Sequence, residues 1–536
     1  MSQNIGNQPV LVLDEDTERT SGKDAQSMNI SAAEAVAESV RTTLGPKGMD
    51  KMLAGDDGGN VIITNDGVTI LNQMDIEHPA ADMIVEVAES QEEEIGDGTT
   101  SSVVITGELL KKSRDLIDQD VHPTVITEGY RKASAKAQEV LEENASNVEP
   151  DDRELLEKIA STAMTGKGPD EITNNITDLI VGAVTAVNDN GKVDLDNIKI
   201  ESVVGGSTSD SELIDGLIFD GVSTHENMPS TVEDADVALL DTPIEIQETE
   251  TDAEINVESA QDFQNVLDQE EEQLREIVDE IDEAGADVIF SEEDIDDMAV
   301  HFLAKKGIMT VEGIDEDDVH KLARATDGEV ISNINGIDSD DFGYAGEITE
   351  KLIGGDVKIY VRDCENPKSV SLVLRGGTEH VVDELERSIE DGLNVVALAI
   401  KNGKILPGGG ATEVQVAKEV RDYADSVSGR QQLAVEAFAD ALEVIPRTLA
   451  ENAGLDSIDS LVELRSEHDA GEEAAGLDVY SDQVKDMYDE GVIEPLGVKT
   501  QAFSSANEAS KMILRIDDVI SADVGGGGGG ADVPGM

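Results

Sequence analysis

The stretch Gly96-Asp97-Gly98-Thr99-Thr100 separates two helical patterns in the first quarter of the chain. Apolar residues recur at helical spacing before it, between residues 81 and 88, and after it, between residues 103 and 110. The stretch therefore begins a helix, and the free N–H groups and positive dipole end of a helix start bind anions. Because glycine lets the backbone approach a ligand closely, the pattern predicts a phosphate-binding site.

Asp97 puts a carboxylate where this phosphate would lie. Two anions in contact repel each other unless a divalent cation separates them, and Mg²⁺ prefers carboxylate, phosphate and water oxygens as ligands. We therefore interpret Asp97 as a Mg²⁺ ligand. The alternative is an ordinary loop with an acidic helix cap, and the stretch alone does not decide between the two.

Two further glycine-rich stretches, Leu44-Gly45-Pro46-Lys47-Gly48 and Gly408-Gly409-Gly410, extend the prediction. The first ends a helical pattern that runs from Asn29 to Thr43, because Gly45-Pro46 stops the helix. Together the three stretches look like the wall of one nucleotide pocket. Lys47 does not fit the Gly-x4-Gly-Lys-Ser/Thr pattern of phosphate loops, so we interpret it as structural or as an outer phosphate contact.

Two other loops present candidate polar residues, Asp66 and Lys167. Thr64-Asn65-Asp66-Gly67 is a strong turn signal between the apolar runs 61–63 and 68–71, which predicts a pair of strands with Asp66 at its tip. Lys167 lies between two glycines after a helical pattern that carries Leu155 and Ile159. We expect this lysine to be exposed.

The middle of the chain, from about Leu217 to Asp363, alternates short β-rich runs with helices. This alternation predicts an α/β domain inserted between mostly helical outer segments. A long helix within it carries an apolar stripe from Phe263 to Ile281 and an acidic opposite face, and such stripes are usually core. The β-rich runs are residues 237–240, 287–290, 308–311 and 330–331.

The last part of the chain is again mostly helical. A strand predicted at Ser369 to Leu374 precedes a helix from about Glu379 to Ala399. On this helix Asp391 lies off the apolar stripe, on the face of Glu384 and Arg387. Further helical patterns cover residues 434–449 and 507–516, and the glycine run at residues 525–530 is expected to be flexible.

Length and charge restrict the class of protein. A chain of 536 residues is too long for one hydrophobic core and predicts about three or four domains. Its 118 acidic and 38 basic residues give a net charge of −80, which argues against nucleic acid as a partner. Such charge repels itself in dilute buffer, whereas the screening length falls to about 3 Å at 1 M salt. We therefore expect a protein of a very salty cytoplasm, with its acidic residues mostly on the surface.

Cysteine content and targeting signals indicate the compartment. Cys364 is the only cysteine, so an intrachain disulfide or a cysteine cluster that binds metal is impossible, and a reducing compartment fits. The first residues lack a basic region followed by an apolar run, and no apolar stretch approaches the roughly 18 residues that span a membrane. We expect a soluble, cytoplasmic protein without a membrane partner.

Several segments resemble group II chaperonins, specifically archaeal thermosome subunits of the haloarchaeal type. The resemblance runs in order from about residue 28 to residue 520, and its joint match is far more specific than any single motif. The segments that carry it are TTLGPKGMDKML (42–53), TNDGVTIL (64–71), GDGTTS (96–101), EHVVDELERSIED (379–391), GGGAT (408–412), RTLAENAGLD (447–456) and MILRIDDVI (512–520).

The resemblance implies a multidomain fold that combines α+β and α/β parts. A mostly helical equatorial domain that binds ATP would comprise residues 1–150 and 405–523, and a small intermediate hinge domain residues 151–216 and 369–404. An α/β apical domain would comprise residues 217–368, with a helical protrusion at about 244–284 that serves as a built-in lid. Residues 524–536 would form a flexible tail. Group I chaperonins share the phosphate motifs but lack this lid.

The resemblance also implies a role for each candidate residue. Asp97 would bind Mg²⁺, and Lys167 would sense the γ-phosphate. Asp66 and Asp391 match family positions that orient and activate the attacking water, which positioned carboxylates can do by accepting a proton late in phosphoryl transfer. The phosphates would lie against Leu44, Gly45, Pro46, Gly98, Thr99 and Thr100, and the nucleoside against Gly409, Gly410, Asp478 and Glu494. Residues 476–486 depart from the usual family sequence, which weakens the alignment of Asp478 and Glu494.

The function that follows is an ATP-driven folding chamber. Its subunits would form homo- or hetero-oligomeric double rings, bind ATP with Mg²⁺ and also K⁺, and capture non-native polypeptides, which expose apolar surface that native proteins bury. Two alternatives keep the same nucleotide motifs: a nucleotide hydrolase without a folding role, and a ring-forming scaffold whose ATP site governs assembly. A lid that closes with ATP would separate the folding chamber from both.

Overall fold

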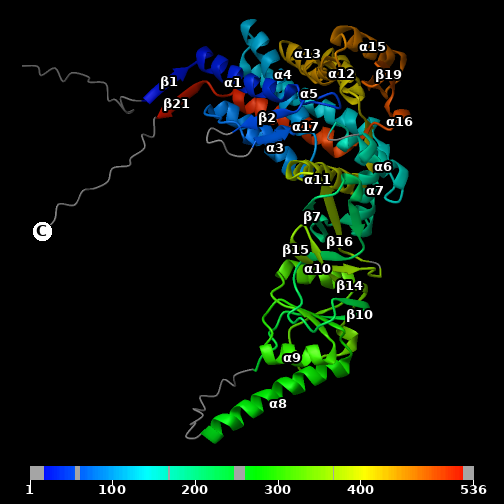
Figure 1. The fold of residues 1–536 in the computed structure, drawn as a ribbon. Helices are drawn as coiled ribbons and strands as arrows, with labels where there is room; N and C mark the ends of the chain where they lie inside the picture. Colours follow the sequence, from blue (N-terminus) through cyan, green and yellow to red (C-terminus); the bar gives the residue numbers. More distant parts are fainter. Residues whose placement is uncertain (1–16, 55–60, 167–169, 247–259, 366, 523–536) are drawn as a thin grey trace, which may run out of the picture. The chain divides into compact units, whose positions relative to one another are not determined.

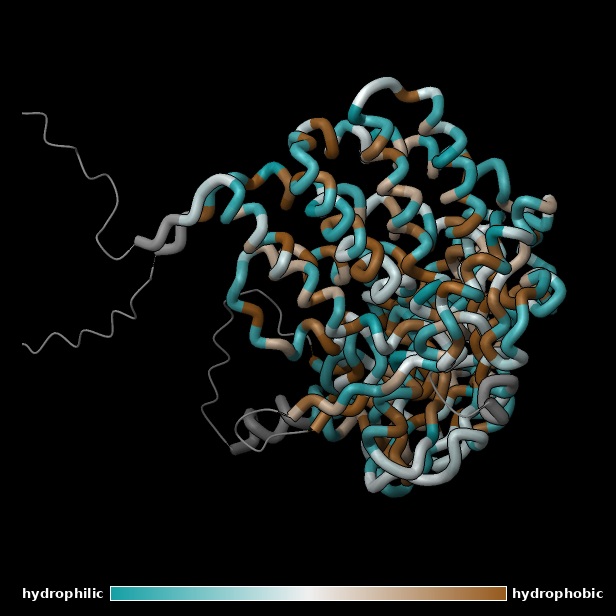
Figure 2. Tube along the Cα trace, turned by 90° about the horizontal axis from the view of Figure 1, so that it is seen from above, coloured by the Kyte–Doolittle hydropathy of each residue, from teal (hydrophilic) through white to brown (hydrophobic). Residues whose placement is uncertain are grey.

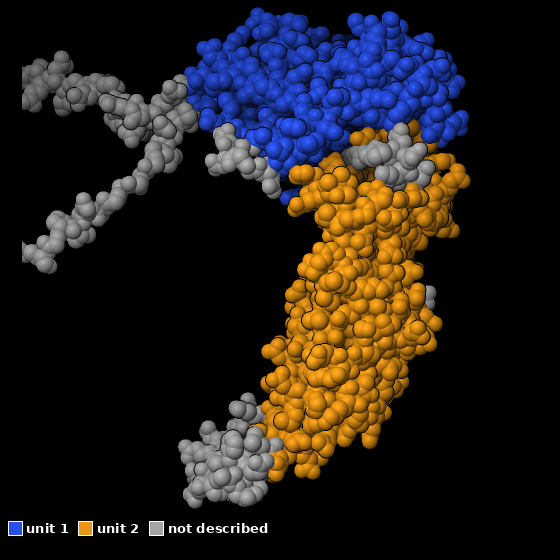
Figure 3. Space-filling model, in the orientation of Figure 1, with its two compact units in different colours: residues 1–145, 407–490, 498–536 blue, residues 146–406, 491–497 orange. Residues whose placement is uncertain are grey.

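The computed structural model describes residues 17–54, 61–166, 170–246, 260–365 and 367–522 (Figure 1). The chain divides into two compact units (Figure 3). The first unit comprises residues 1–145, 407–490 and 498–536, and the second comprises residues 146–406 and 491–497. The first unit is thus assembled from both ends of the chain.

The first unit is a helical bundle built around α4 (Thr99–Asp118). Residues 102–110 of this helix are all buried, and all of them except Glu108 are small or apolar. Helices from both ends of the chain pack against it, namely α1, α3 and α5 from the N-terminal part and α13 and α14 from the C-terminal part. The helices of the unit besides α4 are α1 (Lys23–Arg41), α2 (Gly67–Asn72), α3 (Pro79–Ile95), α5 (Pro123–Asn144), α12 (Ala411–Ala424), α13 (Gln431–Leu442), α14 (Val444–Asn452), α15 (Ser457–Ala470), α16 (Met487–Glu490) and α17 (Leu496–Leu514), which begins in the second unit.

Three small antiparallel strand pairs complete the first unit. β1 (Thr17–Ser21) pairs with β21 (Asp518–Ala522), so the two ends of the described chain lie side by side. β18 (Ala475–Asp478) pairs with β19 (Gln483–Asp486). The third pair is β2 (Lys51–Ala54) with β3 (Val61–Thr64).

The predicted pair of strands around Asp66 is wrong. Residues 61–64 do form a strand, but its partner is β2, and residues 67–72 form helix α2 instead of a second strand. The Asp66 carboxylate accepts a hydrogen bond of 2.7 Å from the N–H of Thr69, which makes it the N-cap of that helix. The sequence Asp-Gly is common both in turns and at helix starts. Here the hydrogen bond from the N–H of Thr69 to the Asp66 carboxylate stabilises the helix start.

The second unit contains a seven-stranded sheet covered by helices. Its strand order is β12-β11-β10-β14-β15-β9, and β13 also pairs with β10. β10, β11, β12 and β13 are parallel, and β14, β15 and β9 are joined antiparallel. The predicted alternation of short strands with helices is therefore confirmed. The elements are β9 (Leu217–Asp220), β10 (Thr231–Leu240), α8 (Ala260–Ala284), β11 (Val288–Ser291), α9 (Asp297–Lys306), β12 (Met309–Val311), α10 (Glu316–Thr326), β13 (Val330–Ile331), β14 (Gly343–Ile353) and β15 (Asp356–Arg362).

The two faces of this sheet bury different side chains. Val237 and Leu239 of β10 pack with residues of α10, whereas Ala238 and Leu240 pack with residues of α8 and α9. This alternation follows from the two-residue repeat of a strand. In α8 the predicted stripe is buried at Leu274, Val278 and Ile281, while the side chains at Phe263, Val266 and Leu267 lie outside the described part.

The second unit also contains a three-stranded sheet and three further helices. β16 (Val370–Gly376) pairs in parallel with β7 (Ile198–Val204) and antiparallel with β8 (Glu212–Ile214). The predicted long helix is α11 (Glu379–Asn402), which packs against α6 (Arg153–Met164) and α7 (Asp170–Ala186). The remaining strands are β4 (Ser146–Asn147), β5 (Asn188–Asp189), β6 (Lys192–Val193), β17 (Lys404–Pro407) and β20 (Ile493–Pro495).

Charged side chains lie mostly on the surface, as predicted. Hydrophilic and hydrophobic stretches alternate along the helices (Figure 2), which is the pattern of amphipathic segments. Cys364 is buried and free, and burial raises the pKa of its thiol to about 12, so the thiol is protonated and unreactive. The buried Asp, Glu, Lys and Arg residues of the described part are Glu108, Lys358, Asp391, Glu413, Glu443 and Lys499.

Candidate functional site

The start of α4 presents backbone N–H groups without a side-chain cap. Its N-cap residue Gly98 has a left-handed conformation with φ 78°, and no side chain accepts a hydrogen bond there. The first helical hydrogen bond runs from the N–H of Ser102 to the carbonyl of Gly98 at 3.0 Å, so the N–H groups of residues 99–101 have no acceptor within the helix. This is the geometry that binds an anion.

The contacts of Gly98 explain why no other residue fits at this position. A Cβ atom there would lie 2.8 Å from Cγ1 of Val498, and φ is in the left-handed region. Gln91, which is fully buried, donates from Nε2 to the carbonyl of Asp97 at 2.7 Å and lies 3.4 Å from the carbonyl of Val498. Its Oε1 has no hydrogen-bond partner among the described residues. Gln91 and Val498 therefore contact the loop at residues 97 and 98 and fix its position. The side chain of Asp97 is half-buried.

Sequence reasoning missed Gln91 and Val498. A signal for Gln91 was present, since it lies on the same face of α3 as Ile84 and Ala88, where a polar residue among apolar ones requires a partner. Val498 gave no such signal, because it lies near the other end of the chain from the loop that it contacts.

The start of α12 repeats the geometry of α4. Gly410 is its N-cap with φ 78°, and no side chain caps this helix start either. A Cβ atom at Gly410 would lie 2.7 Å from Cβ of Pro446 in α14. The N–H of Leu477 donates to the carbonyl of Gly409 at 2.8 Å, which joins the glycine stretch to β18.

The loop after α1 is held by the same helix α14. Asn452 donates from Nδ2 to the carbonyl of Leu44 at 2.9 Å. The ammonium of Lys47 lies 4.6 Å from the ring centroid of Tyr480, a cation–π contact. This contact agrees with the structural interpretation of Lys47. Since α14 also packs against α4 and β18, the three glycine-rich stretches are brought together in one unit.

Asp478 lies at the end of β18 and is strongly hydrogen-bonded. Its carboxylate accepts from the ammonium of Lys485 at 2.7 Å, from the hydroxyl of Ser481 at 2.5 Å and from the N–H of Tyr480 at 2.9 Å. Burial opposes ionisation, but these hydrogen bonds outweigh it and lower the pKa of Asp478 to about 2. The carboxylate is therefore charged at every physiological pH.

Asp66 lies near the start of α4. A Cβ atom at the following residue, Gly67, would lie 2.6 Å from Oγ1 of Thr100, so the two segments are in contact. The remaining candidates belong elsewhere. Asp391 and Glu494 are part of the second unit, where Asp391 is buried on α11 with 8% of its surface exposed, and Lys167 lies outside the described residues.

The residues around Asp97 fit a magnesium ion that is bound together with a nucleotide. Within the described residues there is no group of three or more His, Cys, Asp or Glu side chains that could hold a metal ion. A Mg²⁺ ion at Asp97 would take its other ligands from phosphate and water, as this ion commonly does. The uncapped start of α4 supplies the donors for such a phosphate.

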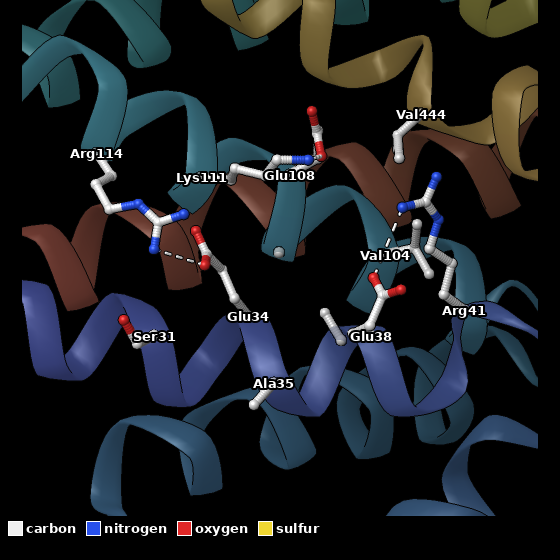
Figure 4. Close-up of a pocket in the computed structure, with 12 residues that line it drawn as sticks. Ser31, Glu34, Ala35, Glu38, Arg41, Val104, Glu108, Lys111, Arg114 and Val444 are labelled. Carbon is white, nitrogen blue, oxygen red and sulfur yellow. Dashed lines mark hydrogen bonds and ion pairs between the residues drawn. The ribbon is translucent and has the colours of Figure 1, made fainter.

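A cavity of about 380 Å³ lies between α1 and α4 but contains none of the predicted nucleotide residues (Figure 4). Charged pairs surround it: Arg114 Nη1 lies 2.8 Å from Glu34 Oε2, and Lys111 Nζ lies 3.0 Å from Glu108 Oε2. Burial raises the pKa of Glu34 despite the nearby Arg114. This cavity is thus a charged hollow beside the middle of α4, away from its N-terminus.

Residues 36–524 match the TCP-1/cpn60 chaperonin family. The chain belongs to this family. As a chaperonin, it is an ATPase subunit of a ring complex that folds other proteins. The resemblance to group II chaperonins is confirmed.

Archaeal relatives cover almost the whole chain. It is 60% identical to thermosome subunit alpha of Halobacterium salinarum over 99% of this chain and 95% of that protein. It is also 60% identical to thermosome subunit 1 of Haloferax volcanii, over 98% and 94% of the two chains. The thermosome subunit of Methanopyrus kandleri is 56% identical over 96% and 95%. Across the described ranges, every helix is too short or too polar to cross a bilayer.

Proposed function

We propose that the first unit of this chaperonin binds Mg·ATP and that the chain is a subunit of a closed double ring with a built-in lid. The observation that carries the proposal is that the three glycine-rich stretches lie in one unit and that two of them end in uncapped helix starts. The stretches at residues 44–48 and 408–410 both contact α14, which also packs against α4. In this scheme residues 1–150 and 405–523 form the equatorial domain. Residues 151–216 and 369–404 form the intermediate domain, and residues 217–368 the apical domain.

Different residues of the chain would bind the phosphates, the nucleoside and the metal ion. The N–H groups of Thr99 and Thr100 and the loop of Leu44, Gly45 and Pro46 would hold the phosphates. Gly409, Gly410, Asp478 and Glu494 would bind the nucleoside, with Lys167 at the γ-phosphate. Asp97 would hold Mg²⁺, which neutralises phosphate charge when bound, and K⁺ would bind as a further ion.

Two carboxylates would act on the attacking water. One oxygen of Asp66 is engaged with Thr69, so Asp66 would orient water through its other oxygen. Asp391 would be brought from the second unit and accept the proton late in the reaction. Hydrolysis would then depend on closure, since one of the two carboxylates is carried by another unit.

Replacing Asp391 tests this division of roles. We expect Asp391→Ala to bind ATP and assemble into rings but to lose hydrolysis by roughly 10²- to 10⁴-fold, the usual contribution of a positioned acid or base. Turnover, nucleotide affinity and ring mass are measured in molar salt. Asp383→Ala, an exposed carboxylate on the same helix, is the matched control and should leave all three unchanged. Unchanged turnover in Asp391→Ala would show that Asp391 does not act in ATP hydrolysis.

Closure distinguishes a folding chamber from a scaffold or a simple hydrolase. We expect ATP to protect the region 244–284 from protease and to promote refolding of an aggregation-prone client by the same rings. A scaffold would assemble with ATP but leave the client aggregated. Native mass measurement of the same rings would give their subunit number and show whether one or several subunit types are present.

A further inference from the structure

A buried ion pair joins two helices of the first unit. Glu413 of α12 is fully buried, and the side chain of Lys499 in α17 is 5% exposed. Lys499 Nζ lies 2.8 Å from Glu413 Oε1. Neither oxygen of this carboxylate makes a hydrogen bond among the described residues, so the contact with Lys499 is an ion pair set by distance. The ammonium group of Lys499 is therefore the charged partner of this carboxylate.

Burying such an ion pair in a core has a large desolvation cost. Removing each ion from water costs several kcal/mol, and two apolar side chains of similar volume are often as stable or more stable at the same place. Fully buried Lys and Glu are also rare. Stability alone therefore does not explain the pair, and a role in fixing the relative position of two segments is the best-attested use of buried polar groups.

The two residues lie beside two of the glycine-rich stretches. Glu413 is in the first turn of α12, three residues after Gly410. Lys499 directly follows Val498, whose Cγ1 closes the space beside Gly98 and whose carbonyl lies 3.4 Å from Gln91 Nε2. The pair thus connects the start of α12 with the support of the start of α4.

We propose that Glu413 and Lys499 are positioning residues for the nucleotide site, where they fix the distance between the helix start at Gly410 and the helix start at Gly98. The inference rests on the proposed nucleotide site. A nucleotide held between the two starts requires them at a set separation, and misplacement by about 1 Å can cost up to about 10²-fold in function. The pair acts through the backbone and does not itself touch the nucleotide.

The test uses the full chain assembled in molar salt. The double variant Glu413→Gln/Lys499→Met removes both charges and nearly keeps both volumes, so no unpaired buried charge remains. Glu413→Asp keeps the charge but shortens the side chain by one methylene, so α12 and α17 must shift to keep the pair. Melting temperature, ring mass, Kd for Mg·ATP, KM and kcat are measured for each variant.

We expect both variants to assemble, with a Kd and KM for ATP raised by roughly 10- to 100-fold and a much smaller change in kcat. The control is Glu34→Gln/Arg114→Met, a pair of 2.8 Å in the same unit that does not contact the glycine stretches, and it should leave Kd unchanged. An assembled double variant and an assembled Glu413→Asp with normal Kd would overturn the proposal.

Asp97→Asn, measured in parallel, separates this inference from the site itself. If Asp97→Asn loses Mg²⁺-dependent ATP binding while the pair variants do not, the pair is only structural. If Asp97→Asn binds Mg·ATP normally, the proposed site is wrong and the inference fails with it.

Discussion

His468 is a single residue whose surroundings make it sensitive to pH. It is a fully buried residue of α15, where Nε2 donates to the carbonyl of Ala475 in β18 at 2.8 Å and Nδ1 lies 2.9 Å from the side-chain amide oxygen of Gln415 in α12. Burial lowers the pKa of His468 below its ordinary value of 6.5, and the nearby Lys418 acts in the same direction. The folded chain therefore keeps this ring neutral at a pH where the unfolded chain protonates it.

The sign of the resulting pH dependence is set by linkage. Between the lowered pKa and 6.5 the unfolded chain binds more protons, so stability rises with pH in this window. The stabilisation is complete above about pH 6.5 and is lost as pH falls through the folded-state pKa. We expect His468→Gln to remove part of the loss of melting temperature on acidification. His320→Gln, at an exposed histidine, serves as the control, and an equal acid sensitivity of wild type and His468→Gln would contradict the account.

Single residues also show where sequence reasoning reached its limit. The glycine stretches were recognisable, because glycine is the residue that lets a backbone turn sharply and approach a ligand closely, and the three stretches do gather in one unit. The supports around them were not recognisable. Val498 and Lys499 owe their positions to packing with segments that lie far away in the chain, and no local pattern encodes such contacts.

At the scale of elements, helix α2 begins where two local sequence patterns overlap. Asp66 fits both a hairpin turn and a helix N-cap, and the structure contains the N-cap. The strand before it, β3, pairs with β2 and not with a strand after Asp66. Long helices such as α4 and α11 follow the prediction closely, because their apolar residues repeat over many turns. Short elements depend on tertiary partners and were predicted less well.

The cap also allows the two roles of Asp66 to be separated. Asparagine caps a helix about as well as aspartate, whereas alanine loses roughly 1 kcal/mol of stability. We expect Asp66→Asn to melt like the wild type but hydrolyse ATP more slowly, and Asp66→Ala to lose both stability and activity. Thermal unfolding and turnover are measured in the same buffer. Full activity in Asp66→Asn would show that Asp66 serves only as the N-cap of α2 and not in hydrolysis.

At the scale of the whole molecule, net charge dominates the response to salt. A charge of −80 on each subunit repels neighbouring subunits, and the screening length is about 10 Å at 0.1 M salt but about 3 Å at 1 M. We expect rings formed in molar KCl to dissociate on dialysis to low ionic strength, as followed by sedimentation. Rings that remain intact at low ionic strength without Mg²⁺ and K⁺ would refute this expectation.

The assembly of the first unit from both ends of the chain has a consequence for synthesis on the ribosome. Helix α4 is complete early, yet α13 and α14, which cover it, are translated more than 300 residues later. At about 5 to 20 residues per second this delay lasts roughly 15 to 60 s. During that time the nascent N-terminal helices expose the apolar surface that chaperones recognise. We therefore expect this chaperonin subunit to need chaperones itself during its synthesis.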